Sequence, residues 1–180
     1  MSERRLRLPI HDAVGFVLSR PHYPENVGAS ARALKTMGFD QLILFKPSRL
    51  AVPAHEMAFK MAVKSWDVLY GAQRVDTLDA ALDGAEMVLA TTSRRGVSGI
   101  LSPRSAANEL FELAARGGRA RILFGNEKTG LAENELARAT HFVRIPMVAD
   151  QPSINLAQAV QIVAYELLAT ALDRRVPADP

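Results

Sequence analysis

The chain has 180 residues and a net charge of +3, and 48% of its residues are hydrophobic. This length suits a single domain over residues 1–180, and the hydrophobic fraction excludes a disordered chain. The absence of cysteine excludes disulfides, thiolate metal sites and a cysteine nucleophile, and we expect no metal centre. No signal-peptide core is found, and no apolar run approaches the roughly 20 residues of a membrane-spanning helix, so we expect a cytoplasmic protein without membrane contact.

The predicted elements alternate between strands and helices. In chain order they are a strand at 14–18, a helix at 24–37, a strand at 41–45, helices at 56–64 and 77–82, a strand at 87–90, a helix at 103–115, a strand at 121–124, a helix at 133–139, a strand at 142–145 and a helix at 154–172. The apolar runs of the strands are continuous rather than alternating, which is typical of strands covered on both faces. The predicted fold class is therefore α/β, with a mostly parallel sheet and helices on both faces. The last helix has a wide apolar stripe, which favours burial on two sides and suggests a subunit interface.

In sheets of this kind, ligands bind beyond the carboxyl ends of the strands, so the loops after Leu18, Ala90, Phe124 and Ile145 are the candidates. The mildly positive charge permits a polyanionic partner without requiring one.

The first of these loops leads into a helix that carries Asn26, Gly28 and Arg32. A helix N-terminus favours an anion such as phosphate, and Gly28 allows close approach of a ligand or of backbone. In a regular helix Asn26 and Arg32 point about 240° apart, so only an irregular first turn would bring them together. The alternative is that Asn26 caps the helix and Arg32 is an ordinary surface residue.

The loops after the next two predicted site strands carry small and polar residues. Thr91, Thr92 and Ser93 offer hydroxyls for a small polar ligand, although a plain turn explains them equally well. Gly125 and Gly130 bracket Glu127, which indicates tight turns beside a ligand. This segment matches neither a phosphate-binding loop nor a dinucleotide fingerprint. The alternative for Glu127 is a helix cap for the turn before Glu133.

The last candidate loop joins an apolar segment to the final helix. Ile145, Pro146 and Met147 can frame a flat slot suited to a heteroaromatic ring. Ser153 is predicted as the N-cap of the final helix, with Asn155 in its first turn.

Taken together, the loops resemble the three motifs of the SpoU/TrmH-type RNA ribose 2′-O-methyltransferases, a branch of the SPOUT superfamily. The motifs are N-x-G-x-x-x-R at 26–32, G-x-E-x-x-G at 125–130, and I-P-M at 145–147 followed by S-x-N-x-x-x-A at 153–159. Within that family the chain looks most like the TrmJ-type tRNA (cytidine/uridine) 2′-O-methyltransferases. It departs from them in having Asn126 where arginine is expected, and it ends at Pro180, where some TrmJ-type proteins continue into a C-terminal extension.

The resemblance implies a trefoil knot in the C-terminal half, a homodimer with the active site near the subunit interface, and S-adenosyl-L-methionine as methyl donor. It implies that the donor is bound by Thr91, Thr92, Ser93, Gly125, Asn126, Glu127, Gly130, Ile145, Pro146, Met147, Ser153, Asn155, Leu156 and Ala159. The implied catalytic residues are Arg32, Asn26, Glu127, Ser153 and Asn155. Since free arginine is too weak an acid to serve as a general base, we expect Arg32 to act as a cation that stabilises developing alkoxide.

The resemblance also implies the substrate, a pyrimidine at nucleotide 32 of the tRNA anticodon loop, with ribosomal RNA as the runner-up. A non-catalytic RNA-binding protein with the same knotted fold is the alternative from another class. The joint presence of Asn26, Arg32, Glu127, Ser153 and Asn155 disfavours it, because a lost site has no reason to keep them all.

Overall fold

In the computed structural model of the chain, the structure describes residues 6–94, 96–148 and 153–175. Within these residues one sheet of seven strands forms the centre of the molecule, in the order β3-β2-β1-β6-β4-β7-β5, and every neighbouring pair is parallel. The strands are β1 (Val14–Ser19), β2 (Leu42–Phe45), β3 (Gln73–Val75), β4 (Met87–Thr91), β5 (Ile100–Leu101), β6 (Ala120–Phe124) and β7 (His141–Val143). The predicted parallel sheet is confirmed.

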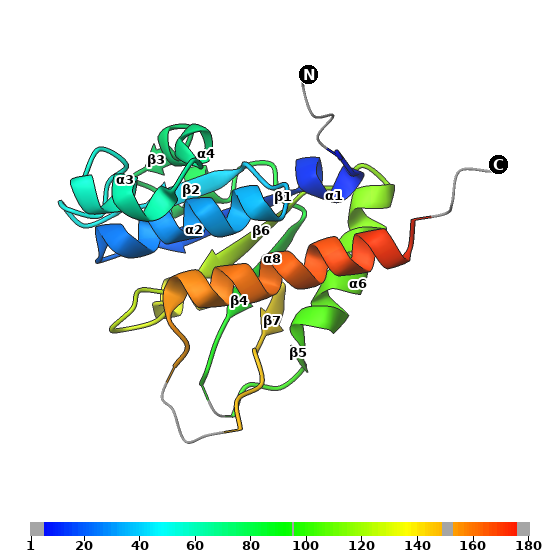
Figure 1. Cartoon of the computed structure of the whole chain (residues 1–180). Coiled ribbons are helices and arrows are strands. Elements are labelled where there is room, and N and C mark those ends of the chain that lie inside the picture. Colours follow the sequence, from blue (N-terminus) through cyan, green and yellow to red (C-terminus); the bar gives the residue numbers. More distant parts are fainter. Residues whose placement is uncertain (1–5, 95, 149–152, 176–180) are drawn as a thin grey trace.

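Helices cover both faces of this sheet, as predicted (Figure 1). They are α1 (Pro9–Ala13), α2 (Pro24–Thr36), α3 (Glu56–Ala62), α4 (Trp66–Tyr70), α5 (Leu78–Ala81), α6 (Pro103–Ala115), α7 (Glu133–Leu136) and α8 (Leu156–Asp173). The larger core lies between the sheet and helices α1, α2, α6 and α8, and α3 and α4 pack against α2. The smaller core lies on the other face, under α5 and α7.

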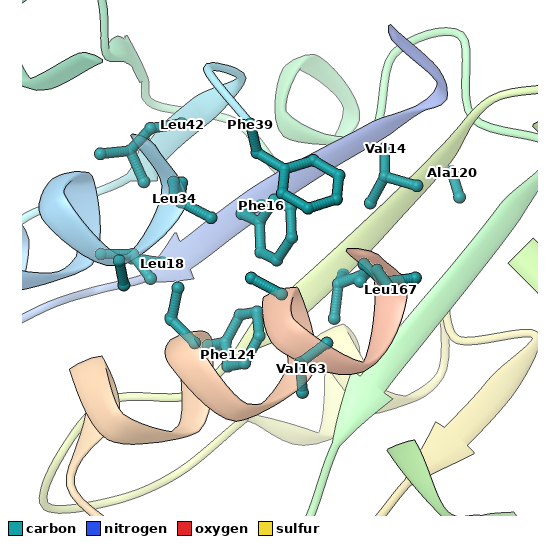
Figure 2. Close-up of a cluster of buried hydrophobic side chains, with 14 of the residues drawn as sticks. Val14, Phe16, Leu18, Leu34, Phe39, Leu42, Ala120, Phe124, Val163 and Leu167 are labelled. Atoms are coloured by element: carbon teal, nitrogen blue, oxygen red, sulfur yellow. The ribbon is translucent and has the colours of Figure 1, made fainter. Parts of the chain in front are cut away.

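The larger core is built around Phe16 of β1, which is fully buried (Figure 2). Its ring meets that of Phe39 edge-on at 5.1 Å and stacks on that of Phe124 at 6.1 Å between centroids. Val163 and Leu167 of α8 close over this cluster. Because β1 and β6 are neighbours, α8 is held directly above the two central strands whose loops carry the first two motifs.

The predicted final helix differs from the observed one at its start. The prediction that Ser153 is its N-cap is wrong, because α8 begins at Leu156 and Asn155 occupies the N-cap position. The Asn155 side-chain oxygen accepts hydrogen bonds from the backbone N–H groups of Ala157, at 3.0 Å, and Gln158, at 3.3 Å. Asparagine and serine are about equally good N-caps, so residue type alone does not choose between them.

Four short elements, α1, α4, β3 and β5, lie outside the predicted set. Strands β3 and β5 lie at the two edges of the sheet and have only three and two residues. Their residues are exposed or half-buried, so they lack the continuous apolar run that marks the central strands. The predicted strand at 142–145 ends earlier, at Val143.

Candidate active site

The strand order brings the four candidate loops to neighbouring positions. Strands β1, β6, β4 and β7 are adjacent in the sheet, and all run in the same direction. Their carboxyl ends therefore form one continuous edge, at which the loops after Ser19, Phe124, Thr91 and Val143 meet. The predicted location of the site beyond the carboxyl ends of these strands agrees with this geometry.

A cavity of about 330 Å³ opens at this edge. Three loops and the start of α8 form its walls, so segments far apart in the sequence converge on one space. Of the residues predicted to bind the methyl donor, those that line it are Thr91, Thr92, Ser93, Gly125, Asn126, Glu127, Gly130, Ile145, Met147, Ser153, Leu156 and Ala159. Pro146 is exposed and does not line the cavity. Asn155 does not line it either, but its side chain donates a hydrogen bond to Asn26. Residues 149–152 of the last motif segment lie outside the described residues.

The glycine-bracketed loop has a backbone that admits no larger residue at its start. A Cβ on Gly125 would lie 2.5 Å from the carbonyl carbon of Gly130, and Gly130 itself has a positive φ of 67°. The backbones of Asn126 and Gly130 hydrogen bond in both directions, at 2.8 and 3.2 Å. The Asn126 side-chain oxygen accepts from the N–H groups of Lys128 and Thr129. Asn126 therefore holds the loop as an acceptor, a role that an arginine at this position would not fill.

Glu127 leaves this loop and binds the segment in front of α2. Its carboxylate accepts from the backbone N–H groups of His22, at 2.8 Å, and Tyr23, at 3.2 Å. The N-cap of α7 is Ala132, so the alternative that Glu127 caps the turn before Glu133 is wrong. A carboxylate at this position also complements the positive end of the α2 dipole.

Asn26 connects Glu127 to the last motif. Its amide nitrogen donates to Glu127 at 2.9 Å, and its amide oxygen accepts from the Asn155 side chain at 3.0 Å. Asn26 is 8% exposed, and the N-cap of α2 is Tyr23, so the alternative that Asn26 merely caps the helix is wrong. Three residues from three motifs thus form one hydrogen-bonded chain beside the cavity.

Arg32 lies apart from these three hydrogen-bonded residues. Helix α2 is α-helical from Pro24 to Thr36, so no irregular turn brings Arg32 to the side of Asn26. The Arg32 side chain is exposed and does not line the cavity, and among the described residues it has no hydrogen-bond or ion-pair partner. Gly28 meets backbone, since a Cβ there would clash with the Ala58 carbonyl group of α3.

Sequence reasoning missed several residues of the cavity wall. Arg94 pairs with Glu133 and donates to the Leu131 carbonyl group at 3.1 Å, which ties the loop after β4 to the loop after β6. The Arg144 side chain donates to the Arg94 carbonyl group, which joins the loop after β7 to the same wall. The sequence signal for Arg94 is its position after a predicted strand, whereas Arg144 lies inside the predicted strand at 142–145 and joins the loop because β7 ends at Val143.

In the described part of the chain, no group of three or more His, Asp or Glu residues is arranged to hold a metal ion. In the same residues, no helix combines the length and hydrophobicity needed to cross a bilayer.

Comparison with known proteins gives consistent matches in sequence and in structure. Residues 13–165 match the model of the SpoU rRNA Methylase family. The chain is 38% identical over 158 residues to the tRNA (cytidine/uridine/adenosine-2′-O-)-methyltransferase TrmJ of Pseudomonas aeruginosa, which covers 87% of this chain and 60% of that protein. It is 36% identical over 171 residues to the tRNA (cytidine/uridine-2′-O-)-methyltransferase TrmJ of Pectobacterium atrosepticum, which covers 94% of this chain and 69% of that protein.

Among solved structures, a putative methylase family protein from Neisseria gonorrhoeae superposes with a TM-score of 0.85 at 31% identity, covering 99% of this chain and 91% of that one. The family match and this superposition confirm the predicted α/β fold, including the trefoil knot that the SpoU fold implies. The chain spans about three fifths to two thirds of the length of the curated relatives it matches.

Proposed function

The chain belongs to the SpoU rRNA Methylase family, and we propose that it transfers a methyl group from S-adenosylmethionine to the 2′-hydroxyl of a ribose in RNA. The observation that carries the proposal is the hydrogen-bonded chain of Asn155, Asn26 and Glu127 beside a cavity lined by the second and third motifs. The predicted cytoplasmic location stays a prediction.

The residues of the cavity fit the methyl donor. Its volume of about 330 Å³ lies in the range of small-molecule sites. Gly125 lets the two ends of its loop pack closely in the cavity wall, and the side chains of Ile145, Met147 and Leu156 form an apolar part of that wall. Thr92 and Ser93 supply hydroxyl groups on the opposite loop, so the cavity combines an apolar surface with a few directional polar groups.

S-adenosylmethionine would supply a methyl group held by a positively charged sulfur. The ribose oxygen would bond to the methyl carbon as the carbon–sulfur bond breaks, S-adenosylhomocysteine would leave, and the hydroxyl proton would pass to water. Because a ribose hydroxyl is a poor nucleophile at neutral pH, this protein must align it and stabilise its developing negative charge. We assign alignment to Asn26 and Asn155, whose amides are held by each other and by Glu127. Arg32 supplies the positive charge, and Ser153 completes the polar wall.

The position of Arg32 supports a homodimer as part of the proposal. The exposed Arg32 side chain does not line the cavity of its own subunit, so in the proposal it acts on a reacting ribose at a site shared with a second copy. Helix α2, which carries Arg32, packs beside α8 (Figure 1). Tyr165 and Leu172 of α8 are 54% and 44% exposed, and large apolar side chains of this kind are typical of a face that a second subunit covers.

We propose tRNA as the substrate, with a pyrimidine at nucleotide 32 as the target. The support is similarity to the two TrmJ proteins, whose names both state tRNA, cytidine and uridine, with adenosine added for the protein of Pseudomonas aeruginosa. Ribosomal RNA is the competing substrate, and the experiment must separate the two.

The test is to incubate the protein with methyl-labelled S-adenosylmethionine and with separated tRNA and rRNA from cells that lack it. The methylated nucleotide is then mapped by its resistance to alkaline cleavage, which 2′-O-methylation confers. We expect label at nucleotide 32 of tRNA. Label in rRNA would overturn the substrate, label on a base would overturn the ribose assignment, and no label in either RNA would contradict the proposed function.

A further inference from the structure

A buried carboxylate lies behind the wall of the cavity, outside the three motifs. Glu135 of α7 is 1% exposed. Its carboxylate accepts hydrogen bonds from the Ser19 hydroxyl and the Ala132 backbone N–H. Ser19 ends β1 and is itself fully buried, so Glu135 joins the end of the central strand to the start of α7. A buried charge persists only where hydrogen bonds and an opposite charge compensate it.

The opposite charge is Arg20. Its guanidinium lies 2.9 Å from the Glu135 carboxylate, and its side chain is one-third exposed. The same terminal nitrogen donates to the carbonyl oxygen of Gly130 at 3.0 Å. Arg20 thus links the buried carboxylate to the backbone of the glycine-bracketed loop, which lines the cavity.

The backbone of Arg20 is held as firmly as its side chain. Its φ is +50°, a left-handed conformation that residues with a side chain rarely adopt. Its N–H donates to the Phe45 carbonyl group at 2.7 Å, and its own carbonyl group accepts from the Asn126 side chain at 2.6 Å. Contacts at both the backbone and the guanidinium hold the conformation that directs the side chain toward Gly130.

These contacts place Arg20 between the two ends of one loop. Asn126, at the start of the loop, binds the Arg20 backbone, and Gly130, at its end, receives the Arg20 side chain. The Gly130 carbonyl group also accepts from the Asn126 N–H at 3.2 Å, so one oxygen atom serves both contacts. A shift of Arg20 would therefore move the loop that carries Gly125, Asn126 and Glu127.

We propose that Arg20 is a positioning residue for the methyl donor: the buried Glu135 carboxylate fixes its guanidinium, and the guanidinium fixes the Gly130 carbonyl group and with it one wall of the cavity. This inference rests on the proposed function, because it takes S-adenosylmethionine as the ligand of the cavity. Arginine suits the role because its planar group donates in several directions at once, whereas lysine offers one compact charge.

The experiment measures S-adenosylmethionine binding by calorimetry and amide hydrogen exchange of the ligand-free protein, for wild type, Arg20→Met and Arg20→Lys. We expect Arg20→Met to weaken binding about tenfold, the effect of one lost charge-assisted hydrogen bond. The Gly130 amide, which donates to the Asn126 carbonyl group at 2.8 Å, should exchange faster in this variant. Arg20→Lys keeps a positive charge beside Glu135, so it should fold like wild type and still bind several-fold more weakly.

Arg138→Met is the matched control, since it breaks an arginine–carboxylate pair with Asp79 just beyond α7 and away from the cavity lining. It should leave both readouts unchanged. Glu135→Gln should weaken binding in the same direction as Arg20→Met, and the two losses should not add in the double variant, because both break the same chain of contacts.

The outcomes separate the inference from the proposed function. Wild-type affinity in a folded Arg20→Lys variant, together with unchanged exchange at Gly130, would overturn the positioning role while leaving the proposed function intact. The same follows if Arg138→Met loses as much affinity as the Arg20 variants. Absence of binding by the wild-type protein at millimolar ligand would overturn both.

Discussion

Two residues of one helix, Asn26 and Arg32, lie in opposite environments. Asn26 is buried and bound by Glu127 and Asn155, whereas Arg32 is exposed on the other side of α2. A single subunit therefore builds the cavity that we propose for the methyl donor, together with the hydrogen-bonded amides beside it. Arg32 of the same subunit does not line that cavity, and in our proposal a second copy supplies the charge for the reacting ribose.

Loss of Arg32 should have the largest effect. We expect Arg32→Ala to lower single-turnover methylation about 1,000-fold, the scale of losing a charge that stabilises an oxyanion. Its affinity for S-adenosylmethionine should equal that of wild type, because Arg32 does not line the cavity. Arg116→Ala, which removes an exposed arginine at the end of α6, should leave both values unchanged. If Arg32→Ala also lost affinity for S-adenosylmethionine, Arg32 would not act on the ribose alone, and the contrast between Asn26 and Arg32 would fail.

Gly28→Ala tests whether the glycine between these two residues serves packing or ligand. Because its Cβ would clash with the Ala58 carbonyl group, α2 and α3 must separate. We expect the free energy of unfolding to fall by about 3 kcal/mol, at the upper end of the cost of overpacking. Urea denaturation measures it, and donor affinity at a temperature where the variant is folded serves as the second readout. Unchanged stability with lost donor affinity would assign Gly28 to the ligand instead.

Asn155→Ala should have a smaller effect on stability and a clear one on activity. It removes the N-cap of α8 and leaves the buried Asn26 oxygen without its donor, so the free energy of unfolding should fall by about 2 kcal/mol. Methylation should fall at least about tenfold. Asn155→Ser separates the two roles, because serine can cap α8 while its shorter side chain does not reach Asn26. It should regain only the capping part of the stability, about 1 kcal/mol, and full recovery of activity would contradict the alignment role.

The smallest effect concerns His11, far from the site in the larger core. It is 1% exposed, and burial, reinforced by the Arg7 charge, lowers its pKa below the ordinary 6.5. The unfolded chain therefore binds a proton more readily than the folded one. The contribution to stability is present above about pH 6.5 and is lost as the pH falls through that value. Urea denaturation at about pH 7.5 and about pH 5.5 should show that the free energy of unfolding of the wild type falls at the lower pH. The fall should be smaller in His11→Gln, and an equal fall in the two proteins would refute the role of His11.

The sequence predicts the central strands well because each contains a continuous apolar run, as in residues 42–45, and it predicts the site loops because strand ends are recognisable. It misses the edge strands, which are short and whose residues are exposed or half-buried. The sequence does not predict hydrogen bonds between side chains that are distant along the chain. Asn26 and Glu127 are 101 residues apart, and Arg20 and Glu135 are 115 apart. Neither residue of the second pair belongs to a motif. Ser153 and Asn155 show a third limit, since two good caps compete and packing selects one.

Mixing two inactive variants tests most directly whether the two sides of the site come from different subunits. One partner is Arg32→Ala, and the other is Gly125→Ala, whose added methyl group would lie 2.5 Å from the Gly130 carbonyl carbon in the cavity wall. Random exchange of subunits at equal amounts makes half of the dimers mixed. Each mixed dimer has one intact site, formed by the donor cavity of the Arg32→Ala subunit and Arg32 of the Gly125→Ala subunit. Single-turnover methylation should then recover to about a quarter of wild type. A mixture as inactive as either variant alone, with subunit exchange verified by mass, would contradict the shared site.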